Sequence, residues 1–339
     1  MTQIMNQQIL LKSRPLGSIN PEENFHFIET PLQDLKDHEV SVRNIYLSLD
    51  PTHRIWISDK KQYMEPIQLG DVVRSFSVGK VYRSKHPDFQ EGDIVTGLLG
   101  WQSYAHVKGD SLVKIPKPHP QPLSSVLSVF GLTGVTAYFG LLDIAHPQAG
   151  ETVVVSAAAG AVGSIVGQIA KIKGCRVVGI CGSKEKCTWL VDELGFDAAI
   201  DYKNESVEAR LDAECPEGID VYFENVGGPL LDMILKRINK FARISLCGFI
   251  SSYNEEKLQP GPSYFPQILL QRAKIQGFII TDYAPRWHEA VKELQIWVNS
   301  GKIKYKEDIV QGIENAPKAL TKLFNGANSG KLLVQVSEA

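Results

Sequence analysis

The stretch that most constrains the fold is Thr152–Gly174, which has the pattern of a strand, a tight turn and a helix in immediate succession. Four β-prone residues, Thr152–Val155, form an apolar run, and small residues then fill a turn that ends at Gly163. Apolar residues recur beyond the turn at helical spacing until a glycine ends the helix. A second apolar run, Arg176–Cys181, predicts the next parallel strand. Such a βαβ unit favours an α/β domain with a doubly wound parallel sheet.

The turn within this unit suits a phosphate ligand. It follows the pattern Ala158-x-Gly160-x-x-Gly163, with alanine where the dinucleotide-binding fingerprint has its first glycine. Small side chains let the backbone approach a pyrophosphate, and the helix N-terminus offers N–H groups and partial positive charge. A close crossing of helix and strand without a ligand is the alternative reading. The residues predicted to contact the pyrophosphate are Ala159, Gly160, Ala161, Val162 and Gly163.

The loop after the second strand indicates which dinucleotide would bind. An NAD site places an acidic residue about 20 residues beyond the glycines to bind the ribose 2′-hydroxyl. Here the strand ends in Cys181-Gly182-Ser183, with no acid at its tip. Ser183 and two cations, Lys184 and Lys186, suit a 2′-phosphate instead, so we predict NADP(H). The alternative is that both lysines are ordinary solvated charges at a helix start.

Length and charge narrow the class of protein. A chain of 339 residues is expected to form two domains, and a net charge of −2 provides no basic field for nucleic acid. The sequence has no apolar run of about 18 residues and no signal-peptide pattern, so we expect no membrane span and a cytoplasmic location. The five cysteines are odd in number and lack disulfide-framework or C-x-x-C spacing. They fit a reducing compartment, as small core residues.

The rest of the chain divides around the nucleotide unit. Before residue 122, short β-rich runs are broken by Pro, Gly and charged turns, which predicts an antiparallel β-barrel-like domain. The proline-rich segment 116–122 is expected to mark the boundary. Strands predicted at Lys306–Val310 and Lys331–Val336 are expected to rejoin the first domain. The predicted domains are therefore residues 1–122 with 301–339, and residues 123–300.

Several motifs resemble a known family nearly from end to end. The chain is similar to the zinc-independent medium-chain dehydrogenase/reductase superfamily, in the branch of leukotriene B4 dehydrogenase, prostaglandin reductase, plant double-bond reductase and bacterial curcumin reductase. The motifs that carry this resemblance are Asn44–Pro51, Gly134–Leu142, Ala157–Lys171, Tyr222–Gly228, Cys247–Asn254 and Asn328–Lys331.

The resemblance implies a fold, an activity and a set of site residues. It implies a GroES-like domain, a Rossmann NADP-binding domain and NADPH-dependent reduction of the C=C bond of α,β-unsaturated carbonyls, often by a homodimer. It places Lys186 at the 2′-phosphate and Tyr202 beside the adenosine. It also implies that Asn328 closes over the cofactor from the first domain. The residues that it places near the nicotinamide half are Asn225, Cys247, Gly248, Phe249 and Ile250.

A metal site is not expected. Zinc-dependent relatives bind catalytic zinc through Cys and His of the first domain, because zinc needs such deprotonated ligands. The first 174 residues contain no cysteine, and the pair His38-Glu39 leads into an alternating strand without a cysteine partner. Without zinc to polarise an alkoxide, alcohol oxidation is disfavoured.

Reduction of an enone would need a proton donor. As hydride adds to the β-carbon, negative charge grows on the carbonyl oxygen, and a tyrosine O–H can stabilise it. The candidates are Tyr253, which follows a strand end, and Tyr63, in a loop that could overhang a cleft. With His53 they form the predicted substrate pocket. The alternative is that each tyrosine packs at the surface and that the cofactor ribose donates the hydrogen bond.

Two other functions remain open at this point. A quinone oxidoreductase would use the same scaffold and NADPH. A non-catalytic NADPH-binding module is favoured by two departures from the family pattern, because Thr52 and Leu270 stand where relatives carry pocket tyrosines.

Overall fold

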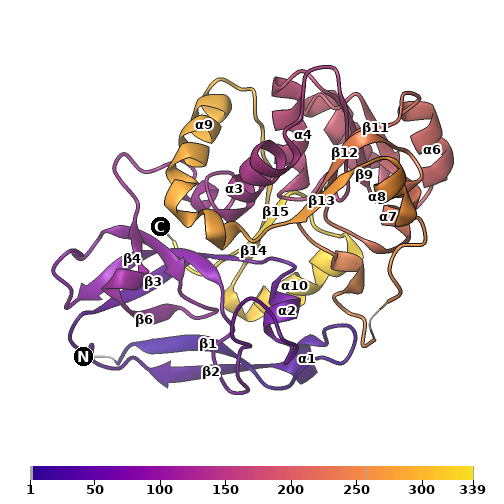
Figure 1. Cartoon of the computed structure of the whole chain (residues 1–339). Helices are drawn as coiled ribbons and strands as arrows, with labels where there is room; N and C mark the ends of the chain where they lie inside the picture. The colour runs from indigo at the N-terminus through magenta and orange to yellow at the C-terminus, as the bar shows by residue number, and fades with distance from the viewer. Residues whose placement is uncertain (1–2, 258, 339) are drawn as a thin grey trace. The chain divides into compact units, whose positions relative to one another are not determined.

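The computed structural model describes residues 3–257 and 259–338. The chain forms two compact units (Figure 1). The first unit comprises Met1–Leu127 and Glu307–Ala339, and the second unit comprises Ser128–Lys306.

The first unit is built around an antiparallel sheet. Its seven strands run in the order β14-β15-β3-β4-β5-β7, and β6 pairs with β3 outside this path. A separate two-stranded ribbon pairs β1 with β2. The strands are β1 (Met5–Leu11), β2 (Phe25–Pro31), β3 (Glu39–Ser48), β4 (Phe76–Ser84), β5 (Ile94–Leu98), β6 (Tyr104–Lys108), β7 (Val113–Lys114), β14 (Glu307–Gln311) and β15 (Lys331–Gln335).

The C-terminal strands β14 and β15 belong to this sheet. β15 pairs antiparallel with β3, where Leu333 lies opposite Ser48. Helix α10 (Ala316–Asn325) connects the parallel strands β14 and β15, and its buried face contributes Leu320 to the core. Two short helices, α1 (Pro21–Asn24) and α2 (His53–Trp56), complete the unit.

The second unit is a doubly wound parallel sheet, as the βαβ pattern predicts. Its six strands run in the order β10-β9-β8-β11-β12-β13. The strands are β8 (Thr152–Val155), β9 (Arg176–Cys181), β10 (Ala198–Asp201), β11 (Ile219–Glu224), β12 (Ile238–Leu246) and β13 (Lys274–Gly277). The helices are α3 (Leu132–Phe139), α4 (Gly163–Ile172), α5 (Lys184–Thr188), α6 (Val207–Glu214), α7 (Gly228–Leu235), α8 (Pro266–Leu270) and α9 (Trp287–Asn299).

The two faces of this sheet are covered by different helices. Successive side chains of a strand point to opposite faces. Val153 and Phe223 accordingly join a core with α3, α4 and α9, while Val154 and Tyr222 join a second core with α6 and α7. Because both faces are covered, the central strand β8 is buried at every residue rather than alternating.

Some predicted element boundaries were wrong. The apolar segment Leu123–Phe130 predicts a helix from the sequence, but the structure has only a short 3-10 segment there, Leu123–Leu127. The apolar run Ile275–Ile280 likewise predicts a strand, but β13 ends at Gly277, because Phe278 turns into the core and packs against the ring of Phe223. Strand ends are thus decided by packing partners that lie far away in the sequence.

Candidate functional site

The parallel sheet has one point where its strand order reverses. From β8 the chain passes to β9 and β10 on one side of it, and then crosses over to β11 and β12 on the other side. Open α/β sheets bind ligands beyond the carboxyl ends of the strands at such a switch point. The loops after β8, β11 and β12 therefore define the candidate site.

The turn after β8 brings its small residues tightly against the start of α4. Ala157 adopts a left-handed conformation with φ of 48°, and its carbonyl accepts a hydrogen bond of 2.9 Å from the Gly160 N–H. A Cβ on Gly163 would lie 2.6 Å from that same carbonyl oxygen, so a larger residue has no room there. Helix α4 begins at Gly163, and its first N–H groups have no acceptor within the helix. The five residues predicted to contact the pyrophosphate all lie in this turn.

The loop after β9 forms a basic rim. The Ser183 hydroxyl caps α5 by accepting from the Lys186 N–H at 3.3 Å. Burial lowers the pKa of Lys186, and the nearby charge of Lys203 adds to that effect. The ring of Tyr202 lies against Gly182, where an added Cβ would be 2.9 Å from it. The structure therefore gathers these predicted residues at the ends of β9 and β10.

Lys203 was missed in the sequence analysis. Its ammonium lies 6.0 Å from the centre of the Tyr202 ring. The available signal was its position, because the sequence predicts a short strand at Ala198–Asp201 and Lys203 lies two residues beyond its end.

Buried Glu224 ties the loops after β8 and β11 together, and it was also missed. Its Oε1 accepts hydrogen bonds from the Ser156 hydroxyl and the Tyr222 hydroxyl, both at 3.0 Å, and from the Val226 N–H at 2.7 Å. Burial raises the pKa of this carboxyl. Asn225 is held beside it, because its side-chain amide donates to the Ser156 carbonyl at 2.7 Å.

The loop after β12 packs on the loop after β11. The N–H groups of Cys247 and Gly248 donate to the Glu224 carbonyl at 2.9 and 3.1 Å, and the Ile250 N–H donates to the Asn225 carbonyl at 3.1 Å. Cys247 is not a nucleophile, since burial raises the pKa of its thiol to about 12.

Tyr253 lies in the same loop. Its hydroxyl accepts a hydrogen bond of 3.2 Å from the Phe249 N–H. The Phe249 side chain is 38% exposed. The structure thus brings this candidate together with the residues predicted near the nicotinamide.

The remaining predicted residues belong to the first unit. Tyr63 is 45% exposed, and its hydroxyl lies 2.6 Å from the Thr52 hydroxyl and accepts from the Trp56 ring N–H at 3.0 Å. Thr52 therefore anchors Tyr63. Asn328 lies in the loop before β15, and its amide donates to the Gly330 carbonyl at 3.0 Å.

The geometry does not support a pocket role for His53. Its side chain is fully buried between the rings of Trp56 and Trp101, with ring centres 5.0 and 5.4 Å away. Its Nδ1 lies 2.9 Å from the Asp50 carbonyl oxygen, and burial lowers its pKa to about 4. A neutral imidazole in the core is a packing residue. Sequence reasoning placed it by its motif and could not see these two rings.

The pair His38-Glu39, considered above as possible metal ligands, lies at the start of β3. Within residues 3–257 and 259–338, no group of three or more His, Cys, Asp or Glu side chains is placed to hold a metal ion. Glu39 instead accepts a hydrogen bond of 2.8 Å from the Lys36 N–H at the start of β3. The described part of the chain also contains no helix long and apolar enough to cross a membrane.

Comparison with known proteins identifies the family. A family model described as "N-terminal domain of oxidoreductase" matches residues 7–115, and one described as "Zinc-binding dehydrogenase" matches residues 161–295. An NADPH-dependent curcumin reductase of Escherichia coli (strain K12) is 46% identical over 337 residues, which cover 98% of this chain and 97% of the relative. The chain belongs to the zinc-independent branch of the medium-chain dehydrogenase/reductase superfamily.

Two further members of this superfamily align over almost the whole chain. A 2-alkenal reductase (NADP(+)-dependent) of Nicotiana tabacum is 39% identical, covering 99% of this chain and 98% of the relative. The solved structure of CurA in complex with NADPH from Vibrio vulnificus is 44% identical, with a TM-score of 0.94 over 98% of this chain and 100% of that one. The first unit is accordingly the GroES-like part and the second the Rossmann-type domain, which confirms the predicted fold class.

Proposed function

We propose that this protein reduces the C=C bond of α,β-unsaturated carbonyl compounds with NADPH. The observation that carries the proposal is the set of groups beyond the parallel sheet. A small-residue turn after β8 suits a pyrophosphate, and a hydroxyl and two ammonium groups after β9 and β10 suit a 2′-phosphate. Relatives named as curcumin reductase and 2-alkenal reductase, 46% and 39% identical, support the reaction.

Each unit has a proposed role. Residues 123–300 form the NADP-binding domain, and residues 1–122 with 301–339 form the GroES-like substrate domain. In the NADP-binding domain, Ser183, Lys186 and Lys203 contact the 2′-phosphate, and Tyr202 lies beside the adenosine. The turn at 159–163 binds the pyrophosphate. Asn328 is proposed to contact the cofactor as well.

The loop after β12 is proposed to shape the reacting half of the site. NADPH supplies the hydride that adds to the β-carbon of the substrate. Charge then develops on the carbonyl oxygen, where a neutral O–H donor lowers the barrier. The hydroxyls of Tyr253 and Tyr63 are the proposed donors, and the same groups can pass a proton to the α-carbon. The fixed loop around Glu224 holds Asn225 and Gly248 in place for the cofactor.

Product analysis separates this function from its alternatives. Purified protein should consume NADPH with a panel of enals, enones and quinones and yield saturated carbonyls from the enals and enones, identified by mass spectrometry. Hydroquinone as the sole product, from a quinone in the panel, would indicate a quinone oxidoreductase. Binding of NADPH without turnover across the panel would indicate a non-catalytic module.

A charge substitution tests the cofactor assignment. Lys186→Met should raise KM for NADPH about 10- to 100-fold, since a charge-assisted hydrogen bond is worth roughly 1.5–3 kcal/mol, and leave KM for NADH unchanged. Lys292→Met is the control, because Lys292 is an exposed lysine of α9, an element to which no cofactor contact is assigned. Equal use of NADH and NADPH by the unsubstituted protein would contradict the assignment.

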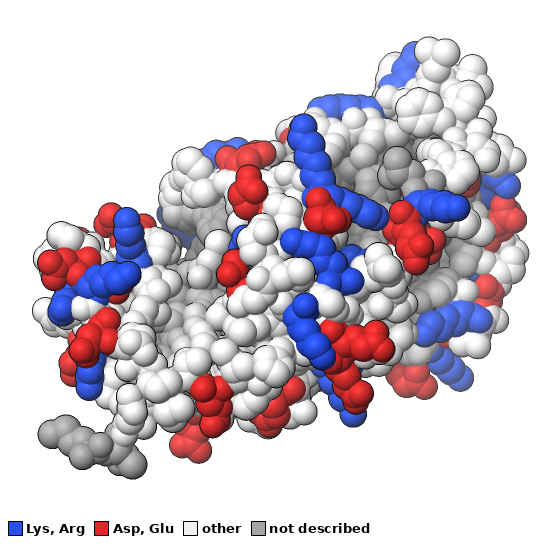
Figure 2. Space-filling model, turned by 90° about the horizontal axis from the view of Figure 1, so that it is seen from below, with Lys and Arg blue, Asp and Glu red and all other residues white. Residues whose placement is uncertain are grey.

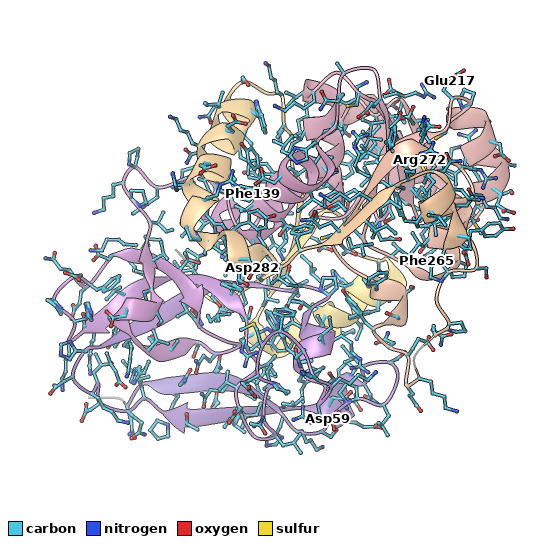
Figure 3. All side chains as sticks on the ribbon, in the orientation of Figure 1. Asp59, Phe139, Glu217, Phe265, Arg272 and Asp282 are labelled. Carbon is cyan, nitrogen blue, oxygen red and sulfur yellow. The ribbon has the colours of Figure 1, made fainter. Side chains whose placement is uncertain are left out.

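We also propose that the protein acts as a cytoplasmic homodimer. β13 is an edge strand with unpaired backbone groups on one side. Beside it α8 carries exposed apolar side chains, including Phe265, 58% exposed, and Leu269, 80% exposed. Phe265 and Arg272 are labelled in Figure 3.

On the face drawn in Figure 2, basic and acidic side chains are interspersed, which supports a small-molecule substrate rather than nucleic acid.

Light scattering tests the dimer. The chain of 37.6 kDa should elute at twice that mass. Leu269→Glu should shift it to the monomer, whereas Leu16→Glu, at a position 85% exposed in the first unit, should not. A monomeric unsubstituted protein contradicts this proposal and leaves the reaction untouched.

A further inference from the structure

Two cysteines meet next to the basic rim. Cys181 is the last residue of β9, and Cys187 lies six residues later in α5. Their Sγ atoms are 3.3 Å apart. A disulfide has an S–S distance of about 2.05 Å, so the sulfurs need to approach by only about 1.2 Å. The five-residue loop between them contains both Ser183 and Lys186.

We propose that Cys181 and Cys187 form a reversible disulfide in response to a peroxide, and that this bond weakens NADPH binding. The second half of the proposal rests on the proposed function, because it takes Ser183 and Lys186 as contacts of the 2′-phosphate. The first half depends on the two sulfurs alone.

Exposure decides which sulfur reacts first. Cys181 is 3% exposed, whereas Cys187 lies in a helix that has no fully buried residue. Burial raises the pKa of the Cys187 thiol, but a hydrogen bond from Cys181 offsets part of this rise. Burial and the Cys187 sulfur both raise the pKa of Cys181 further. Cys187 is therefore the residue of the pair that the oxidant reaches first, and it reacts through the fraction of its thiol that is ionised.

The reaction balances with hydrogen peroxide as the oxidant. The Cys187 thiolate attacks one peroxide oxygen, the O–O bond breaks, and sulfenic acid and water form once a proton is taken up. The Cys181 sulfur then attacks the sulfenic sulfur, loses its proton, and expels the hydroxyl as a second water. Two thiols lose two electrons in total, and one peroxide gains them. A dithiol reductant reverses the step through a mixed disulfide.

The connection to the cofactor site runs through Ser183. Its carbonyl accepts from the Cys187 N–H at 3.0 Å, and its hydroxyl caps the Lys186 N–H at 3.3 Å. β9 is held between β8 and β10, so α5, with five residues, is the element that shifts when the bond forms. That shift displaces the hydroxyl and the ammonium group together. By linkage, bound NADPH must oppose oxidation to the same extent as oxidation weakens NADPH.

The other three cysteines provide internal comparison. Cys175 donates to the Gln148 carbonyl at 3.3 Å, and burial raises its pKa to about 11. Burial likewise raises the pKa of Cys215 to about 11 and that of Cys247 to about 12. These thiols should remain unmodified at peroxide levels that oxidise the pair.

The test uses the full chain treated with hydrogen peroxide, with and without NADPH. After alkylation of free thiols and tryptic digestion, mass spectrometry should find peptides 177–184 and 187–203 joined, with a loss of two hydrogens. NADPH should slow this oxidation. The oxidised protein should bind NADPH at least fivefold more weakly, bind NADH unchanged, and recover with dithiothreitol. Cys187→Ser and Cys181→Ala should both abolish the response, and Cys175→Ser should retain it.

The outcomes separate the two halves of the proposal. The disulfide is overturned if both thiols stay free while other cysteines oxidise. It is also overturned if Cys187 becomes sulfinic acid and the joined peptides are not found. Joined peptides with unchanged NADPH affinity overturn the coupling. If Lys186→Met also leaves NADPH affinity unchanged, the 2′-phosphate assignment has failed, whereas a strong effect of Lys186→Met confines the failure to the coupling.

Discussion

Replacement of His53 should remove a pH dependence from the stability of the first unit. The imidazole is fully buried between Trp56 and Trp101, and its Nδ1 lies 2.9 Å from the Asp50 carbonyl oxygen. His53→Asn keeps a polar atom near the position of Nδ1 but cannot titrate in this range. The variant will also be less stable at every pH because it loses a packed ring. The informative quantity is therefore the change of that difference with pH.

The magnitude follows from the pKa. Burial lowers the pKa of His53 from 6.5 to about 4. Between these values the unfolded chain binds a proton that the folded chain does not, so the free energy of unfolding falls as pH falls. The stabilising contribution is complete above pH 6.5 and is lost progressively down to about pH 4. At about 1.4 kcal/mol per pKa unit, the loss attributable to His53 is roughly 3 kcal/mol.

Nearby charged groups titrate outside this window. Burial raises the pKa of Asp50, but the Lys331 ammonium at 2.5 Å and the neighbouring hydrogen bonds bring it below its ordinary value. Asp50 therefore keeps its charge while His53 titrates. The two contributions appear in separate pH ranges.

Urea unfolding and NMR measure the effect. Unfolding free energies of the protein and of His53→Asn are compared from pH 7.5 to 4.5, and the advantage of the unsubstituted protein should shrink by about 2–3 kcal/mol. In NMR spectra of the unsubstituted protein, the Cε1–H signal of the His53 ring is identified by its absence from the spectrum of the variant. This signal should titrate with a midpoint near pH 4. A constant difference between the two proteins, or a midpoint near 6.5, would refute the reasoning.

Substitutions at three other sites test the packing. Lys331→Met removes the buried ammonium group that pairs with partly buried Asp50 and should cost about 3–5 kcal/mol in urea unfolding, part of which Asp50→Asn should restore; full stability of the single variant contradicts the ion pair. Gly167→Ala places a Cβ 1.9 Å from the Phe196 ring and should cost about 1–3 kcal/mol despite its helix propensity, with Phe196→Leu compensating. Glu224→Gln keeps the acceptor on which three donors converge and should change stability by less than about 1 kcal/mol, whereas Glu224→Leu should lose several-fold more; equal losses disprove this arrangement.

The parallel sheet could be predicted closely because its information is local. The strand expected at Arg176–Cys181 has those bounds in the structure, and Ala198–Asp201 also matches. Both are short apolar runs closed by turn residues, and their burial on both faces follows from parallel pairing. The first unit was predicted less well. The sequence predicts a strand over Asp71–Tyr82, but β4 begins at Phe76. The residues before Phe76 pair elsewhere, and Val72 forms an isolated bridge with Leu10 of β1.

The side chains of the candidate site could be predicted only in part. Gly163 was found because its role depends on neighbours a few residues away. Glu224 was missed because its partners Ser156 and Tyr222 come from two strands, and sequence does not show that a carboxylate at a strand end points inward. His53 was placed wrongly for the converse reason, since the two tryptophans that enclose it lie on α2 and in a distant loop.

Cys181 and Cys187 show that the course of the chain decides which side chains meet. Their spacing fits no disulfide motif, and it brings the sulfurs together only because the chain reverses between β9 and α5. The reversal depends on Ser183, which is extended and caps the helix, so that the next turn folds back over the strand end. The same reversal brings Lys186 near enough to Lys203 that, besides burial, the charge of Lys203 lowers the pKa of Lys186. One capping residue thus positions both a lysine of the basic rim and the thiol pair, and this shared turn is the physical basis of the coupling proposed above.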